Sequence, residues 1–222
     1  MDWDFYLTVK VGGIVVFIFA GGIAAARALK LTRSKAFFIN TCAVLAGYFV
    51  STSWYILQHL YGREPYDFIN FLSAWNGAGA VLYGWIIGGV LTLVLLTHLF
   101  KLPTVRYLDA VLPWMLVAQF LNRLGCYDAG CCFGKPMGSG ETIPVQLIEA
   151  VFDLCLFLFI LLRKSRKGEN TFLYFTGYAA ARFFFEFLRG DNTPALWFMT
   201  VPQVTSVLIL AIVFRLKNKI LL

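Results

Sequence analysis

The stretch GAVLYGWIIGGVLTLVLLTHL, residues 79–99, decides the fold class, because it contains no Asp, Glu, Lys or Arg over a length that can cross a bilayer. A helix needs about 20 predominantly apolar residues to span a hydrocarbon core about 30 Å thick. The whole chain has the same character: 59% of its 222 residues are hydrophobic, 14% are charged and the mean hydropathy is +0.73. We therefore predict an integral membrane protein, whose first partner is lipid.

Further segments of this kind, bounded by charges or Pro, predict an all-α polytopic membrane protein with about seven transmembrane helices. They are Val11–Ala28, Ala36–His59, Gly79–Leu99, Leu108–Tyr127, Val145–Leu162, Phe172–Leu188 and Val201–Phe214. The fourth segment is the most interrupted, because Pro113 and three polar side chains fall inside it. No hydrophilic stretch is long enough for a soluble domain, so we predict a single transmembrane domain over residues 1–222.

The Lys and Arg residues are distributed unevenly between the two sides of these segments. Thirteen of the 19 lie on one set of alternate loops, beginning with the loop that contains Arg27 and Lys35. Basic loops remain cytoplasmic, so we predict an outer N-terminus and a cytoplasmic C-terminus. The net charge of +7 is then an orientation signal and a contact for anionic headgroups. Since no basic patch is interleaved with aromatic residues, a nucleic acid is not expected as a partner.

The stretch LNRLGCYDAGCCFGKP, residues 121–136, lies where the fourth segment reaches the outer leaflet. Non-helical backbone at that depth is tolerated only where it lines a cavity or is buried in protein, so we predict a folded-in loop over residues 125–136 around a site. Arg123 lies one helical turn before this loop. An arginine there costs several kcal/mol unless an anion pairs with it, which makes Arg123 a candidate functional residue.

A second set of charges lies in GYAAARFFFEFLRGD, residues 177–191. Tyr178, Arg182, Glu186 and Arg189 recur at spacings of 4, 4 and 3, so they share one helical face. One interpretation is a site that opens outward. The alternative is structural, with Arg182 and Glu186 as an i,i+4 ion pair that holds the bundle and Arg189 as an interface charge.

A third set is GAGAVLYGWIIGG, residues 77–89. Gly84 and Gly88 have the spacing that allows two helices to approach closely, and packing alone would explain these glycines. Tyr83 is the polar residue in the middle of the cluster.

The cysteines of the loop admit four interpretations. In an oxidising compartment Cys126 would form a disulfide with Cys131 or Cys132. A thiolate near Arg123 and Lys135 would instead serve as a nucleophile that carries a diacylglyceryl or acyl group. Thiol redox exchange is the third. A metal site is the fourth, but three cysteines without a well-spaced fourth ligand do not complete a tetrahedron, so we predict no metal and no cofactor.

Four blocks resemble the prolipoprotein diacylglyceryl transferase family. They are WNGAGAVLYGWIIGG (75–89), NRLGCYDAGCCFGKP (122–136), PVQLIEAVFDL (144–154) and YAAARFFFEFLRGD (178–191). The resemblance implies a multi-pass enzyme of the bacterial inner membrane with its active site toward the outer side. It also implies transfer of the diacylglyceryl group of phosphatidylglycerol to the lipobox cysteine of a preprolipoprotein, with release of glycerol phosphate.

By position, Arg123 and Arg182 resemble the two essential arginines of the family. Two arginines in a low-dielectric cleft would stabilise the charge that develops on the phosphate oxygen of the leaving group. We therefore expect both to hold the headgroup phosphate, Glu186 and Tyr178 to orient them, and Tyr83 to face the reacting centre. The predicted catalytic residues are Arg123, Arg182, Glu186, Tyr83, Cys126 and Cys131; the predicted substrate-binding residues are Tyr178, Gly84, Gly125, Gly130, Gly134, Asn76, Gln146 and Arg189.

The chain departs from the family pattern in ways that leave two other functions open. Tyr83 stands where the family has a His, Cys126 and Cys131 replace an Asn and a Glu, and we expect no outer head domain. A related transferase that moves another part of phosphatidylglycerol to a glycan or small thiol would fit these departures, and so would a non-catalytic lipid-binding protein. His59, at the outer end of the second segment, is a candidate base, whereas His98 lies at the inner end of the third.

Overall fold

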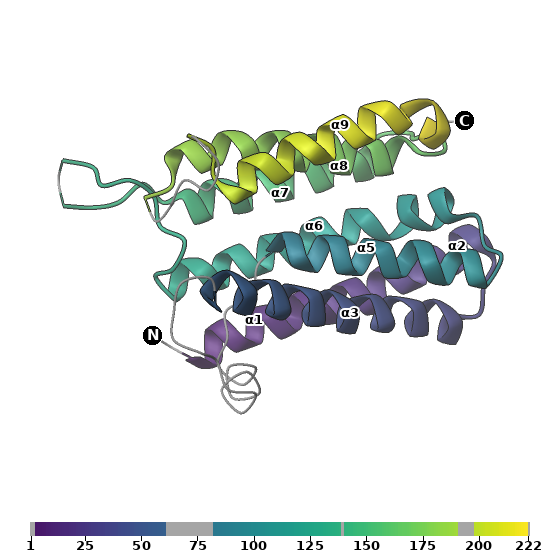
Figure 1. Ribbon diagram of the computed structural model, residues 1–222. Helices are drawn as coiled ribbons and strands as arrows, with labels where there is room; N and C mark the ends of the chain where they lie inside the picture. Colours follow the sequence, from purple (N-terminus) through teal and green to yellow (C-terminus); the bar gives the residue numbers. More distant parts are fainter. Residues whose placement is uncertain (1–2, 61–81, 139, 191–197, 222) are drawn as a thin grey trace. The chain divides into compact units, whose positions relative to one another are not determined.

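The structure, a computed structural model, describes residues 3–60, 82–138, 140–190 and 198–221. Its elements are α1 (Trp3–Val16), η1 (Phe17–Gly21), α2 (Gly22–Leu29), α3 (Arg33–Leu60), α5 (Leu82–Leu99), α6 (Thr104–Asp128), α7 (Val145–Leu162), α8 (Glu169–Phe185), η2 (Glu186–Leu188) and α9 (Val201–Leu221), as Figure 1 shows. The described part of each predicted segment is helical, and α7 has the predicted bounds. Within the described residues extended backbone pairs only as isolated bridges, so the prediction of an all-helical fold is confirmed.

Several helices have the length and composition of membrane spans. Within the described part of the chain, three helices are long and apolar enough to cross a membrane, Phe5–Leu29, Arg33–Ile56 and Val145–Leu162, and a shorter apolar helix covers Tyr83–Leu99. Large apolar side chains face outward on them, such as Leu45 on α3 and Leu162 on α7. A water-soluble surface would rarely carry so many. The membrane character is therefore confirmed, while the count of about seven spans and the orientation of the termini stay predictions.

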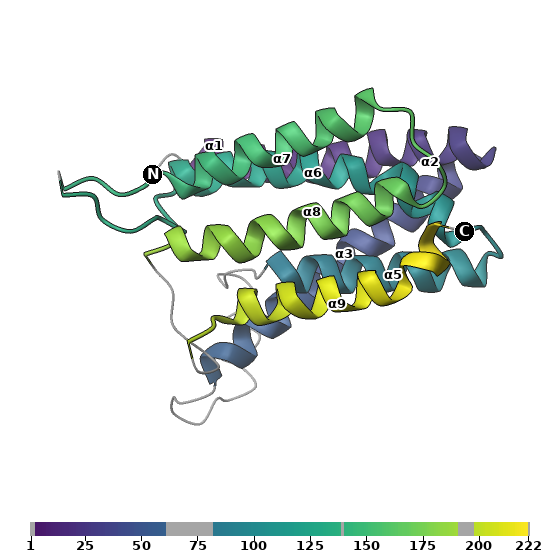
Figure 2. The ribbon, with the colours of Figure 1, turned by 90° about the horizontal axis from the view of Figure 1, so that it is seen from above.

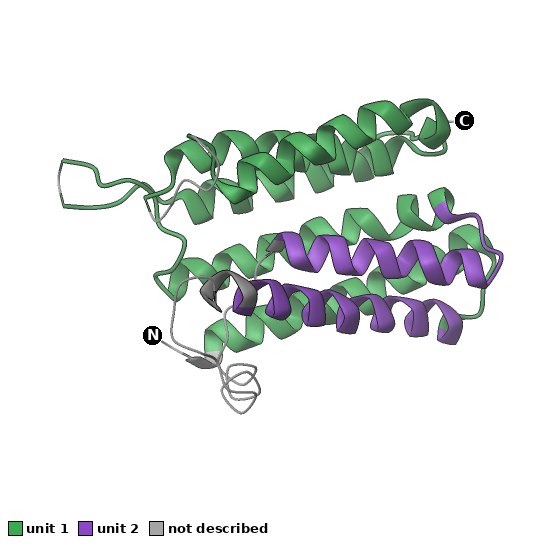
Figure 3. Cartoon of the chain, viewed as in Figure 1, with its two compact units in different colours: residues 1–33, 105–222 green, residues 34–104 purple. Residues whose placement is uncertain are grey.

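The chain divides into two compact units, shown in Figure 3. Unit 1 comprises residues 1–33 and 105–222, and unit 2 comprises residues 34–104. The prediction of a single transmembrane domain is not tested by this division.

Unit 2 pairs α3 with α5 through a seam of small residues. A Cβ on Gly84 would lie 2.5 Å from the Ser51 Cα, and one on Gly88 would lie 2.9 Å from the Ala46 carbonyl oxygen. A side chain at either glycine would therefore collide with the backbone of α3. The packing interpretation of these glycines is therefore confirmed for the α3–α5 contact.

In unit 1, α8 packs against α9 and α7 (Figure 2). The α7–α8 contact is close at Gly177, where a Cβ would lie 3.0 Å from Leu156 Cδ2. At the start of α8 the Asp109 carboxylate of α6 accepts the Thr171 N–H at 2.8 Å and the Thr171 hydroxyl at 2.7 Å, and it also accepts the Gly168 N–H at 2.5 Å. A carboxylate at a helix N-terminus satisfies free N–H groups and opposes the positive end of the helix dipole, so this contact fixes α8 against α6.

Candidate active site

The site begins at the end of α6, which carries the buried Arg123. The helix continues to Asp128, so the prediction that the loop starts at Gly125 is wrong by one helical turn. It ends in a Schellman motif: the Cys131 N–H donates to the Cys126 carbonyl at 3.1 Å and the Gly130 N–H to that of Tyr127 at 3.1 Å. Gly130 has φ +67, the left-handed conformation that this cap requires.

Gly125 lies inside α6 and does not end the helix. A small residue is needed at this position because α1 packs against it. A Cβ on Gly125 would lie 2.9 Å from Val9 Cγ2 and 3.3 Å from Tyr6 Cδ2, both on α1. The glycine therefore allows α1 and α6 to approach next to the site.

The loop after α6 is joined to the end of η2. Gly134 pairs with Arg189 in an isolated antiparallel bridge, and the Lys135 N–H donates to the Leu188 carbonyl at 2.8 Å. A Cβ on Gly134 would lie 2.4 Å from the Ile143 carbonyl oxygen, so a larger residue would displace the backbone. This pairing holds Arg189 beside the loop.

Only the first part of this loop is folded in. Residues 135–138 and 140–142 are exposed and extend away from the helices of unit 1 (Figures 1 and 2). The prediction of a folded-in loop through residue 136 therefore holds only to the buried Gly134. The physical reason is the bridge between Pro136 and Thr142, which closes the exposed part on itself.

One carboxylate joins the two arginines that the sequence singled out. Glu149 Oε2 lies 2.5 Å from Arg123 Nε, and Glu149 Oε1 lies 2.7 Å from Arg182 Nη1. All three side chains are buried, on α6, α7 and α8. Buried charges are retained only when paired, so each oxygen of Glu149 offsets one guanidinium.

The ion pairs continue from Arg182 to the end of η2. Glu186 Oε2 lies 2.9 Å from Arg182 Nη2 and 4.0 Å from Arg189 Nε, so the predicted i,i+4 pair is present. The Thr200 hydroxyl donates to Glu186 Oε1 at 3.0 Å. Thr200 and Gln203 form a capping box at the start of α9, in which the Thr200 N–H donates to Gln203 Oε1 at 3.0 Å. The cap of α9 thus fixes Glu186 as well.

A small cavity of about 10 Å³ lies next to this cluster. Its lining comes from α7 and α8 and consists of Glu149, Phe152, Asp153, Tyr178, Ala181, Arg182 and Phe185. Tyr178 stacks on Tyr174 with ring centroids 6.1 Å apart, and the Tyr174 hydroxyl accepts from Gln119 Nε2 at 3.1 Å. A cavity of this volume has room for about one water molecule. It does not hold a headgroup without movement of its side chains, and its wall carries the Arg182 guanidinium.

Sequence reasoning missed the two carboxylates on α7. Glu149 and Asp153 are buried and lie four residues apart, on one helical face. Both interrupt a long apolar run, and an ionisable residue within a membrane span is a candidate functional residue by default. The sequence of residues 145–162 therefore already contained the signal that identifies Glu149 and Asp153 as candidates.

Three thiols gather at the start of the loop. The Sγ atoms of Cys126, Cys131 and Cys132 all lie within 4.8 Å of one another, and each cysteine is present as a free thiol. Gln146 Nε2 donates to the Cys131 carbonyl at 2.7 Å. Gln146, which we predicted as a substrate contact, holds the loop in this structure.

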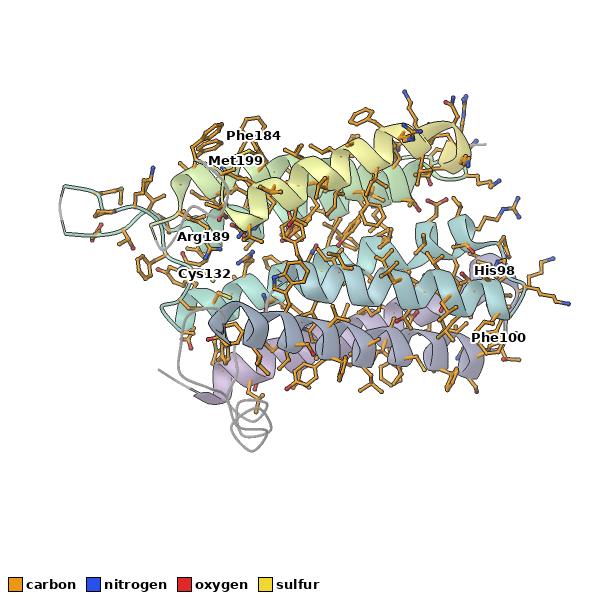
Figure 4. All side chains as sticks on the ribbon, viewed as in Figure 1. His98, Phe100, Cys132, Phe184, Arg189 and Met199 are labelled. Atoms are coloured by element: carbon orange, nitrogen blue, oxygen red, sulfur yellow. The ribbon has the colours of Figure 1, made fainter. Side chains whose placement is uncertain are left out.

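The surrounding hydrogen bonds and charges shift the pKa values of Cys131 and Cys132 in opposite directions. Hydrogen bonds with the Cys126 and Cys131 thiols, and then the positive charges of Arg189 and Arg123, lower the pKa of the Cys132 thiol. Hydrogen bonds with Cys126 and Cys132 raise the pKa of Cys131. Figure 4 shows Cys132 and Arg189 at the same end of unit 1.

The remaining predicted residues belong to unit 2 or fall outside the described residues. Tyr83 and Gly84 are buried in α5 of unit 2, and their predicted roles stay predictions. Asn76 lies outside the described residues, and so does the side chain of His59. His98 is exposed in the last turn of α5, at the end where Figure 4 also labels Phe100.

Comparison with known proteins adds a family. The profile of the prolipoprotein diacylglyceryl transferase family matches residues 4–216. Phosphatidylglycerol–prolipoprotein diacylglyceryl transferase 2 of Clostridium perfringens (strain 13 / Type A) is 34% identical over 60% of this chain and 59% of its own length. The enzyme so named from Clostridium tetani (strain Massachusetts / E88) is 33% identical over 59% of each chain. One from Dehalococcoides mccartyi (strain ATCC BAA-2266 / KCTC 15142 / 195) is 30% identical over 70% of this chain and 67% of its own. The chain thus spans about three fifths of the length of the two clostridial relatives.

Proposed function

Because the chain belongs to the prolipoprotein diacylglyceryl transferase family, we propose that it is a transferase that moves the diacylglyceryl group of phosphatidylglycerol to a prolipoprotein cysteine. Glycerol phosphate is the leaving group. The observation that carries the proposal is the buried pair Arg123 and Arg182, held on the two oxygens of Glu149. We further propose about seven spans in a bacterial inner membrane, an outer N-terminus, a cytoplasmic C-terminus and a site that opens outward.

In this proposal the lipid phosphate binds where Glu149 now faces the arginines. A guanidinium binds phosphate and carboxylate through the same fork of N–H donors, so the phosphate exchanges with Glu149 at Arg123 and Arg182. As the carbon–oxygen bond to the diacylglyceryl group breaks, negative charge grows on the phosphate oxygen. Donors that are already in place and shielded from water stabilise that charge, which is a large contribution to catalysis.

The remaining polar groups position these arginines. Glu186 holds Arg182 at 2.9 Å and is itself held by Thr200 at 3.0 Å. Tyr178 stands on the wall of the cavity beside Arg182. Glu186, Thr200 and Tyr178 therefore keep the Arg182 fork aimed at the cavity, while Arg189 adds a positive charge at the loop. Tyr83 remains in the proposal as the polar group that faces the reacting centre.

The test is a product assay with the purified chain in liposomes. Phosphatidylglycerol carries one label in its glycerol headgroup and another in its acyl chains, and the acceptor is a peptide with a lipobox cysteine. We expect acyl label on the peptide, seen by mass spectrometry, and headgroup label in released glycerol phosphate. Lipid consumed without labelled peptide would contradict the proposed acceptor.

Variants test the role of the arginines. Arg123→Ala and Arg182→Ala should each lower the initial rate by about 100-fold or more, the scale seen when a donor to a developing charge is removed. The matched control is Arg163→Ala, which removes an arginine from the exposed pair with Glu169 and should leave the rate unchanged. Full activity in both site variants would show that the phosphate is held elsewhere.

A further inference from the structure

The fold gathers three thiols at one point by two independent devices. In a Schellman motif the side chains at the third-last helical position and two residues past the cap meet. Those positions here are Cys126 and Cys131, joined by a backbone hydrogen bond of 3.1 Å. Cys132 has φ +61, a left-handed conformation that residues other than Gly and Asn adopt only at a cost. That turn carries the third sulfur to the other two, all within 4.8 Å.

This arrangement suits a metal ion better than a disulfide. A disulfide would join two of the sulfurs and would gain nothing from the strained backbone of Cys132. Three thiolates around a tetrahedral zinc, with Zn–S bonds near 2.3 Å, lie about 3.8 Å apart, which the observed grouping accommodates. The sequence spacing did not indicate this, because it lacks a fourth ligand; the structure adds that the three sulfurs converge.

We propose that Cys126, Cys131 and Cys132 bind one Zn²⁺ as three thiolates and leave its fourth position open. Three protein ligands with an open position are the pattern of zinc sites that bind a reactant, whereas structural sites use four. The polar groups around the thiols fit such a site. Asn122 Nδ2 lies 4.0 Å from Cys126 Sγ, and Gln146 Nε2 holds the Cys131 carbonyl at 2.7 Å.

The charges nearby also fit. Three thiolates and one Zn²⁺ carry a net charge of −1. Arg123 lies three residues before Cys126 on α6, and Arg189 is held beside the loop by its bridge to Gly134, so two cations lie near the thiols. Partners of this kind around the ligands fix their geometry and raise metal affinity.

An open position on zinc has a use in the reaction proposed above, and this step rests on that proposed function. The acceptor cysteine binds Zn²⁺ as a thiolate and its proton passes to water, because a coordinated thiol is deprotonated. Its sulfur then attacks the diacylglyceryl carbon. The S–C bond forms as the C–O bond to phosphate breaks, and the electron pair of that bond leaves with glycerol phosphate. Zinc would thus remove the proton from the acceptor thiol.

The first experiment measures metal binding without activity. The full chain is purified in detergent under reducing conditions, loaded with Zn²⁺ or Co²⁺ and freed of loose ions. We expect about one ion per chain by elemental mass spectrometry and, with Co²⁺, the thiolate-to-cobalt charge-transfer absorption of a tetrahedral site. Cys131→Ser and Cys132→Ser should lose the ion. The control Cys155→Ser, exposed on α7, should keep it.

Cys131→His is the control for loss of zinc binding through misfolding. Imidazole is a zinc ligand, so this variant should regain zinc binding that Cys131→Ser loses. A wild-type chain that binds no ion, or that carries a Cys126–Cys131 disulfide when it is isolated from membranes without reductant, would overturn the proposal.

The product assay separates the metal site from the transferase. If Cys132→Ser loses zinc and still transfers lipid at the wild-type rate, the acceptor-binding step is wrong and the metal site stands. If the wild-type chain binds zinc but labels no peptide, the proposed transfer to a prolipoprotein fails and the metal site again stands. The expected result is loss of both metal and transfer in Cys132→Ser, with both restored in part by Cys131→His relative to Cys131→Ser.

Discussion

The two ends of α7 in unit 1 use charged residues in opposite ways. At the start of α7, Arg123 and Glu149 are 5% and 6% exposed and are paired within the site. At its other end, Arg163 and Glu169 are each 27% exposed. An exposed pair contributes about 0–1 kcal/mol, whereas a buried pair costs several kcal/mol in desolvation that pairing only offsets. Stability alone would therefore favour apolar residues at the first end, and the charges there point to a ligand.

The largest effect is expected when Glu149 is changed to Gln. The amide keeps the shape of the side chain, but it leaves Arg123 and Arg182 buried without their anion. Removing one partner of a buried ion pair costs about 3–5 kcal/mol, so thermal unfolding in detergent should occur at a markedly lower temperature.

Phosphatidylglycerol sharpens this first prediction. Its phosphate offers the two arginines a replacement anion, so adding it to the micelles should raise the unfolding temperature of Glu149→Gln more than that of the wild type. Phosphatidylcholine, whose headgroup is zwitterionic, is the control lipid. Equal stabilisation of both proteins by both lipids would mean that the arginines do not hold the phosphate.

The next largest effect is expected from Gly134→Ala in the loop that holds Arg189. A Cβ there would lie 2.4 Å from the Ile143 carbonyl oxygen, and overpacking of this kind costs about 1–3 kcal/mol. The transfer rate should fall as well, because the pairing of Gly134 with Arg189 is lost. Gly138→Ala, where a Cβ would meet nothing within 4 Å, is the matched control.

Sequence predicted the helices well because each is a long apolar run, and α7 was predicted with its observed bounds. Arg123 and Arg182 were found because a charge in a span is costly by itself. Glu149 was missed because its partners lie on α6 and α8, 26 and 33 residues away, and spacing along α7 does not reveal them. The fourth segment was predicted to end at Tyr127, one residue before the end of α6, but the loop was predicted to start at Gly125, which is instead a contact for α1 inside the helix.

A smaller effect is expected from Asp109→Ala, which acts at the start of α8, just after the end of α7 that carries Arg163. Its carboxylate accepts two N–H groups and one hydroxyl at the start of α8, at 2.5–2.8 Å. Loss of a helix N-terminal acceptor typically costs about 0.5–2 kcal/mol. The unfolding temperature should drop modestly while the transfer rate per folded chain stays at the wild-type value. A rate that falls with Asp109→Ala as far as with Glu149→Gln would break the contrast between the two ends.

The smallest effect is expected from acid at Glu169. Its carboxylate accepts the Arg166 N–H at 2.9 Å, and this hydrogen bond, followed by the charge of Arg163, lowers its pKa below the usual 4.5. A carboxyl whose pKa is lower in the folded state binds protons more tightly when unfolded, so its contribution to stability is present above about pH 4.5 and is lost as the pH falls through its folded pKa. The contribution is small because solvent screens the pair.

Comparing the wild type with Glu169→Gln isolates this contribution. The difference between their unfolding temperatures should be small and constant near neutral pH and should vanish as the pH falls from 4.5 through the lowered pKa of Glu169. A difference that stays unchanged at acid pH would mean that the charge of Glu169 does not stabilise the fold.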